Sequence, residues 1–387
     1  MIENQFVTNF VSSLSKRGKL PISFVLHWED GSSTTMGEEK PILDIYIKNP
    51  AGRKAFMSLD ELLILEAYIK GDIDLEGNLI NAMSFQELLS DQHILLKIGR
   101  RLKPILLGRE KCNPDWISKH YDSNNIQLFA MDTDYNTYTP GIYDKDEDSL
   151  EVGAERKLDF AFQSLNLKPN DSVLDIGSGW GGFLRFAARR NIRVTGITLS
   201  KHQKQYVEDL IEKNNFDDAE VKYQDFFSFQ PSQKYDGIVM MGVIEDLSDY
   251  PRVMERLLNY LKPGGRVYLD FASDKESFVT HSFITKYIWP GTFRMVYMTE
   301  FIDAVRESPF EIQAIYNDRR NYYLWAKGMY ERWMEKKADI IDKSNEQIWR
   351  TFRILFAATA GTMIQSSYYA TAYRVVLELP EDHKSLQ

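Results

Sequence analysis

The chain has 387 residues, a formal net charge of −9, and 13% aromatic residues. This length exceeds one ordinary core and predicts two domains, while the acidic balance argues against bulk nucleic-acid binding, which needs a basic surface. A single cysteine, Cys112, excludes an internal disulfide and favours a reducing compartment. The first ten residues, MIENQFVTNF, lack the cationic start and apolar core of a signal peptide, so a cytoplasmic location is expected.

Residues 1–115 predict a smaller α+β domain. Alternating apolar residues at 41–49 indicate a strand, and residues 58–71 have the apolar spacing of a helix. Six basic residues then alternate with isoleucine and leucine between 94 and 111: Lys97, Arg100, Arg101, Lys103, Arg109 and Lys111. Two readings stay open for this stretch. It is either a helix and linker with a solvated basic face or a peripheral contact with anionic lipid headgroups.

Residues 116–387 predict an α/β domain in which strands and helices alternate. Strands are expected at 172–177, 193–199, 219–225, 235–243, 265–272, 310–317 and 372–379, the fifth introduced by the turn LKPGG. This order predicts a doubly wound, Rossmann-like, seven-stranded sheet that binds ligands at the carboxyl ends of its strands. A helical insertion rich in aromatic and basic residues follows the sixth strand.

One uncharged stretch, between Arg353 and Arg374, has roughly the length that a membrane span demands. Gln365, Ser366 and several tyrosines interrupt it. We therefore expect the end of a helix, a turn and a buried strand rather than a span.

Residues 173–183, VLDIGSGWGGF, place four glycines between an expected strand and an expected helix. A turn that needs positive φ explains one glycine. Four together favour a loop that cradles a ligand, because a helix N-terminus offers free N–H groups to a carboxylate, a phosphate or ribose hydroxyls.

The ligand of this loop is expected to be S-adenosylmethionine rather than NAD. The spacing of the glycines also satisfies the dinucleotide pattern, but that pattern alone is weak. A NAD site needs an acidic residue after the second strand, where this chain has Thr198, Leu199 and Ser200. Acids before the glycines and after the third strand are typical of an S-adenosylmethionine site, and Asp175 and Asp225 occupy those places.

The motifs DIGSGWGGF, GITLSKHQ, QDF, GVIED, LKPGG and KYIWPGT, with the earlier HYD and YTPGIY, occur in one order along the chain. From about residue 117 to the end, the chain resembles the cyclopropane fatty acid synthase family, which includes mycolic acid methyltransferases. The first part is more weakly similar to the N-terminal domain of the bacterial synthases. The resemblance implies an S-adenosylmethionine-dependent methyltransferase that acts on the double bond of an unsaturated fatty acyl chain.

The resemblance also implies roles for residues of the donor site. Gly177 and its neighbours would surround the methionine end, with Tyr138 and Thr139 covering it. Gln203 would contact the ribose, and Asp225 with Gln224 would lie at the adenine. The full expected set is Tyr138, Thr139, Asp175, Gly177, Gly179, Trp180, Gly181, Thr198, Leu199, Gln203, Gln224 and Asp225. Capping or surface duty is the alternative for Gln203 and Asp225.

In the family, a bicarbonate held by a cysteine, a glutamate, a histidine and a tyrosine serves as the base. The glutamate and tyrosine match Glu245 and Tyr322, but Pro140 replaces the cysteine and Asp270 replaces the histidine. A second carboxylate beside Glu245 would repel a bicarbonate. We therefore expect Asp270, with Glu245 as partner, to remove the proton. The alternative makes Asp270 a structural acid at a strand end.

An isolated double bond becomes a carbocation when it is methylated, and aromatic faces stabilise such a cation. The aromatic residues expected near it are Tyr322, Tyr323, Trp325, Tyr330 and Trp333, with an apolar wall at Ile288, Trp289 and Pro290. The product is left open among a cyclopropane, a methylene and a methyl-branched chain. A phospholipid substrate implies a peripheral contact with the inner face of the membrane, and family members are often homodimers.

Two rival functions stay open. One is a methyltransferase of a small-molecule natural product, and the other is an inactive protein that binds lipid or S-adenosylmethionine. No metal site is expected, because no two of the six histidines are three to five residues apart.

Overall fold

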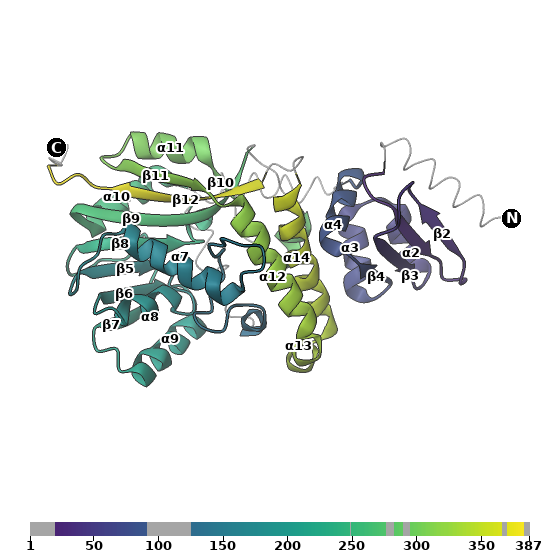
Figure 1. The fold of residues 1–387 in the computed structure, drawn as a ribbon, viewed down its shortest axis with the longest axis horizontal. Helices are drawn as coiled ribbons and strands as arrows, with labels where there is room; N and C mark the ends of the chain where they lie inside the picture. The colour runs from purple at the N-terminus through teal and green to yellow at the C-terminus, as the bar shows by residue number, and fades with distance from the viewer. Residues whose placement is uncertain are drawn as a thin grey trace.

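The computed structural model describes residues 20–90, 125–247, 249–275, 282–288, 295–365 and 370–382. Figure 1 shows a small N-terminal unit at one end, a large sheet covered by helices at the other, and two long helices, α12 and α14, between them. The basic stretch at 94–111, the expected domain boundary near 115, and the HYD motif lie outside the described residues.

The N-terminal unit is α+β, as predicted. Its sheet has the order β2-β1-β3-β4, in which only β1 and β3 are parallel. The strands are β1 (Phe24–His27), β2 (Ser33–Met36), β3 (Leu43–Ile47) and β4 (Ile73–Gly77). The helices are α2 (Pro50–Met57), α3 (Glu61–Lys70), α4 (Leu79–Ala82) and the 3₁₀ helix η1 (Met83–Leu88). Asp60 caps the start of α3 and Gly71, at φ 84°, ends it.

The seven expected strands of the large sheet are confirmed, in the order β11-β12-β9-β8-β5-β6-β7, and a short β10 also pairs with β9. The strands are β5 (Ser172–Ile176), β6 (Arg193–Thr198), β7 (Ala219–Tyr223), β8 (Tyr235–Met241), β9 (Leu261–Asp274), β10 (Val296–Tyr297), β11 (Glu311–Asn317) and β12 (Ala370–Glu378). β12 runs antiparallel to both of its neighbours, so the sheet is mixed at this edge.

The start of the fifth strand differs from the prediction. LKPGG lies inside β9, which begins at Leu261, instead of forming a turn before it. Gly264 takes a positive φ of 77°, and its N–H donates to the carbonyl of Leu379. The glycines therefore bend the strand without ending it, because hydrogen bonds to the chain after β12 continue through them.

The helices that follow the N-terminal unit either cover the large sheet or, like α12 and α14, lie between the sheet and that unit (Figure 1). They are α7 (Leu150–Ser164), α8 (Gly182–Ala188), α9 (Lys201–Asn214), α10 (Tyr250–Tyr260), α11 (Met298–Arg306), α12 (Arg319–Glu335), α13 (Lys337–Lys343) and α14 (Glu346–Ile364). Short helical turns are η2 (Asn125–Phe129), η3 (Ile244–Asp246) and η4 (Ile284–Ile288).

The long uncharged stretch after Arg353 is divided as expected between a helix and a strand: α14 ends at Ile364, and β12 begins at Ala370. Within the part of the chain that the structure describes, none of the helices meets the length and apolarity of a membrane span.

Helix α14 joins the two units, because it packs against both α12 and the N-terminal helices α3 and α4. Arg350 on α14 forms an ion pair with Asp74, at 3.2 Å, and Arg353 donates to the Tyr68 hydroxyl at 2.8 Å. Gly361 lets the helices approach closely, since a Cβ there would lie 2.5 Å from the Met83 Cβ and 2.8 Å from the Ile80 carbonyl oxygen.

We expect Gly361→Ala to destabilise this junction. Overpacking costs about 1–3 kcal/mol, which exceeds the gain of up to about 1 kcal/mol from replacing a helical glycine. Gly328→Ala on α12 is the matched control, because the three atoms nearest to its Cβ all belong to the Leu150 side chain and none of them to the backbone. Urea unfolding should show a loss for Gly361→Ala and none for Gly328→Ala. Equal stability of the two variants would contradict the close approach at Gly361.

Candidate active site

The glycine-rich segment forms the turn between β5 and α8. Gly177, Gly179 and Gly181 have φ of 68°, 52° and 77°, which side chains disfavour. The backbone N–H groups of Gly177 and Ser178 donate to the carbonyl of Ile197, which ties the turn to β6. The turn therefore needs positive φ, as the simpler reading held, and it also borders a cavity.

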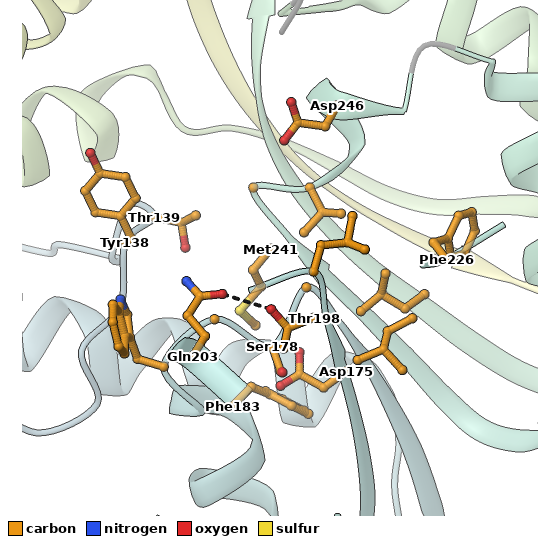
Figure 2. Close-up of a pocket in the computed structure, with 18 of the residues that line it drawn as sticks. Tyr138, Thr139, Asp175, Ser178, Phe183, Thr198, Gln203, Phe226, Met241 and Asp246 are labelled. Carbon is orange, nitrogen blue, oxygen red and sulfur yellow. Dashed lines mark hydrogen bonds between the residues drawn. The ribbon is translucent and has the colours of Figure 1, made fainter. Parts of the chain in front are cut away.

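We call this cavity the glycine-turn cavity; Figure 2 shows 18 of the residues that line it. In this view Tyr138 and Thr139 lie on one side and Phe226 on the other. Eleven of the twelve residues expected at the donor site line it: Tyr138, Thr139, Asp175, Gly177, Gly179, Trp180, Thr198, Leu199, Gln203, Gln224 and Asp225. The turn, the ends of β6 and β7, and the segment before α7 therefore converge on one space.

Gly181 is the expected residue that does not line the cavity. It is the N-cap of α8, and a Cβ there would lie 3.1 Å from Val207. Its lack of a side chain thus serves the turn and the packing against α9. Gly182 lines the cavity instead.

Hydrogen bonds between polar residues order the part of the cavity that lies at the ends of β6 and β7. The Thr198 hydroxyl donates to Gln203 Oε1 at 2.9 Å (Figure 2). Ser200 caps α9 by accepting from the Gln203 N–H. Gln224 donates to the Ser228 hydroxyl at 2.9 Å, and Asp225 accepts from the Ser228 N–H at 3.0 Å. Asp225 thus orders the loop after β7 and also lines the cavity.

The cavity presents buried polar atoms that lack a partner in the protein. Asp175 Oδ2 and Ser178 Oγ are buried and have no hydrogen-bond partner among the residues that the structure describes. Burial raises the pKa of Asp175 to about 7. Gly179 leaves open space, since a Cβ there would meet no protein atom nearer than 3.9 Å. A ligand that carries a positively charged amino group and fits closely against the turn suits these features.

Sequence reasoning missed several residues of this cavity. They include Asn136, Thr137, Phe226, Phe227, Met241 and Asp246. Phe226 and Phe227 directly follow Asp225, so two adjacent aromatic residues after the third strand were an available signal. Asn136 and Thr137 carried no such signal in the sequence, because they lie in the segment before α7 and reach the cavity only in the folded chain.

A second cavity adjoins the first. It is lined by four acids, Glu245, Asp246, Asp270 and Asp318, and by apolar and aromatic residues from β9, α12, α14 and β12. We call it the acidic cavity. Tyr138, Thr139, Gly242 and Asp246 line both cavities. The two spaces therefore share a wall, and all three residues expected to be catalytic, Glu245, Asp270 and Tyr322, line the second one.

Glu245 is a buried acid on η3. Its Oε1 accepts from the Ala272 N–H at 2.9 Å, and within the described part of the chain its Oε2 has no hydrogen-bond partner. Burial raises the pKa of Glu245 to about 8, and nearby Asp246 and Asp270 add to the rise. Burial also raises the pKa of Asp246 to about 7. Glu245 is therefore protonated at neutral pH and can donate a hydrogen bond.

Asp270 differs from Glu245 because it forms an ion pair with a buried lysine. Its Oδ2 lies 2.9 Å from Nζ of Lys157, whose side chain is 1% exposed. Burial raises the pKa of Asp270, and the charge of Lys157 opposes that rise. No sequence pattern pointed to this lysine, because α7 precedes the sheet and lies more than 100 residues from Asp270. The site therefore holds a buried cation that offsets its negative charge.

The aromatic residues divide between the acidic cavity and the core. Tyr322 and Trp325 line the cavity with their ring centroids 5.3 Å apart, and Tyr138 meets Trp325 at 5.9 Å. Burial raises the pKa of Tyr322 well above its ordinary value, so its ring stays a neutral phenol.

Those of the other expected aromatic and apolar residues that the structure describes do not line this space. Trp333 is fully buried and donates to the carbonyl of Trp349, because α12 turns this face toward α14. Tyr323, Tyr330 and Ile288 belong to the same core. Trp289 and Pro290 lie outside the described residues.

A doubly wound sheet with a glycine turn after its first strand, acids at the strand ends and an adjoining reaction cavity defines an S-adenosylmethionine-dependent methyltransferase. The model of one such family, described as mycolic acid cyclopropane synthetase, matches residues 109–371. The chain belongs to this family.

Named relatives support this assignment. A probable fatty acid methyltransferase of Mycobacterium tuberculosis is 25% identical, with 84% of each chain covered. The cyclopropane-fatty-acyl-phospholipid synthase of Escherichia coli is 28% identical over 82% of this chain and 84% of the relative. The crystal structure of mycolic acid cyclopropane synthase CmaA1, complexed with SAH and CTAB, superposes with a TM-score of 0.63 and 19% identity over 68% of this chain and 98% of that chain. This last likeness shows the shared fold.

Proposed function

We propose that this enzyme transfers a methyl group to the double bond of an unsaturated fatty acyl chain. The observation that supports this most is the shared wall: the glycine-turn cavity suits the methyl donor, and the acidic cavity next to it combines neutral aromatic rings with buried acids. Bound S-adenosylmethionine supplies an electrophilic methyl group. The residues positioned to hold it are Asp175 and Ser178, whose buried oxygens lack partners, and Gln203.

The acidic cavity suits a short-lived carbocation on the acyl chain. When the π electrons of the double bond form the new carbon–carbon bond, a positive charge is left on the neighbouring carbon. Tyr322 and Trp325 offer aromatic faces that stabilise a cation without attacking it. Leu355 and Phe356 of α14 add an apolar wall for the alkyl chain.

Asp270 is proposed as the base that removes the proton after methylation. A hydrogen next to a carbocation is strongly acidic. A weak base can therefore remove it, provided that the base is ionised and lies close to the hydrogen. The ion pair with Lys157 favours the ionised form of Asp270, while Glu245 keeps its proton near neutral pH. A protein carboxylate in this position makes a bound bicarbonate unnecessary, and Pro140 lines the cavity where the family places a cysteine.

The proposed function is tested by the lipids of cells that express the chain. We expect a gain of fourteen mass units on monounsaturated acyl chains, because a CH₂ unit is added overall when a methyl enters and a proton leaves. Fragmentation that locates the added carbon distinguishes a cyclopropane from a methylene group. Purified enzyme should act on vesicles of unsaturated phospholipid and not on vesicles of fully saturated phospholipid. Turnover of a small aromatic acceptor with no activity on any unsaturated lipid would contradict the proposal.

A further inference from the structure

Lys157 lies behind the wall that the two cavities share. It lines neither cavity, and it is among the largest side chains that are completely buried. Its ammonium lies 2.9 Å from Asp270 Oδ2 and donates to the hydroxyl of Thr139. One buried cation thus touches a residue of the acidic cavity and a residue that borders both cavities.

The charge of Lys157 acts on acids of both cavities. It opposes the rise in the pKa of Asp270 and Asp318 in the acidic cavity and of Asp175 in the glycine-turn cavity. The other titratable groups that bear on Asp270 come from η3, β9, the start of α12 and β12. They are Glu245, Tyr268, Asp318, Tyr322 and Arg374.

Lys157 is the cation in direct contact with Asp270. Arg374, the other cation that acts on it, lies 3.5 Å from Asp318 and over the ring of Phe160 at 4.4 Å. A charged lysine that is 1% exposed is costly unless a carboxylate compensates its charge. The charged form of buried Asp270 likewise needs a nearby cation. The charged forms of Lys157 and Asp270 therefore stabilise each other, and removing either partner leaves the other as an uncompensated buried charge.

We propose that Lys157 is a positioning residue for methyl transfer, which holds the Asp270 carboxylate as an anion and fixes Thr139 at the wall between donor and acceptor. This inference rests on the proposed function for its catalytic consequence. The pairing itself, in which Lys157 stabilises the Asp270 carboxylate, does not depend on which substrate the enzyme uses.

The first test is the pH profile of Lys157→Met, a substitution of similar length without charge. Loss of an opposite charge at this distance raises the pKa of a carboxyl group by about 1–3 units. The base form of Asp270 is present above its pKa, so the acidic limb of the rate profile should move to higher pH by about that amount. Lys157→Arg should keep the limb near its original position, because it retains the charge.

The matched control is Arg156→Met. Arg156 is the neighbouring residue on α7 and also forms an ion pair with a carboxylate, Asp148, but it lines neither cavity. Its pH profile should coincide with that of the wild type. A Lys157→Met profile that coincides with the wild type in both limb position and rate would overturn the proposal.

The second test needs no turnover. Unfolding is measured for the wild type, Lys157→Met, Asp270→Asn and the double variant. We expect Lys157→Met to lower the free energy of unfolding more at pH 8 than at pH 5, because Asp270 can take up a proton at the lower pH. In the Asp270→Asn background, the same substitution should lower the free energy of unfolding much less. Equal effects in both backgrounds, or a double variant that fails to fold along with Lys157→Met, would refute the pairing.

These two tests separate the inference from the proposed function. A wild type that modifies no unsaturated lipid contradicts the proposed function, whereas the unfolding cycle still decides whether Lys157 holds Asp270. A Lys157→Met protein that fails to fold while the double variant folds supports the pairing.

Discussion

Asp270→Asn is expected to reduce methyl transfer by about 10²–10⁴-fold, the range typical of a lost general base. The amide keeps the shape of the carboxyl group, and its oxygen can still accept from Lys157, which lies 2.9 Å away in the wild type. What it cannot do is take a proton from the methylated chain. The measurement is the release of S-adenosylhomocysteine over vesicles of unsaturated phospholipid, with donor binding measured separately by calorimetry.

Glu245→Gln provides the contrast within the same cavity. Because burial raises the pKa of Glu245 to about 8, this residue is neutral at pH 7, and glutamine preserves both its charge and its acceptor for the Ala272 N–H. We expect a loss of less than about tenfold. Full turnover of Asp270→Asn, or a bicarbonate bound beside Asp270, would show that this carboxylate is not the base.

Gly179→Ala is expected to abolish or greatly weaken donor binding while the fold is kept. A Cβ at this position meets no protein atom nearer than 3.9 Å, so the protein itself has room for it. The methyl group would instead occupy space in the cavity that the turn borders. We expect the affinity for S-adenosylhomocysteine to fall by about tenfold or more, as overpacking of a close contact predicts.

Gly31→Ala is the matched control for Gly179→Ala. Gly31 has a φ of 86° and open space around its Cα, so alanine there carries the same backbone penalty of about 1–2 kcal/mol. It lies in the N-terminal unit and does not line the cavity. Both variants should lose similar stability in urea, and only Gly179→Ala should lose affinity. Equal affinities would mean that the bare Gly179 serves the turn alone.

The sequence by itself determined the seven main strands of the large sheet and the glycine turn that borders the cavity. The run Ser172–Ile176 is buried throughout and mainly apolar, and such a pattern depends only on local periodicity. The glycines between Gly177 and Gly182 mark a strand-to-helix turn through backbone conformations that side chains resist. Both signals are local, so they can be read without knowing which segments meet in space.

Pairing across the chain was decided only by the tertiary structure. Lys157 and Asp270 stand on a helix and a strand whose contact depends on the crossover geometry of the whole sheet, so no spacing in the sequence relates them. The aromatic residues of α12 all have helical spacing, yet Tyr322 lines the acidic cavity and Trp333 faces α14. The direction of each face depends on how α14 packs between the two units, which is a property of the assembled fold.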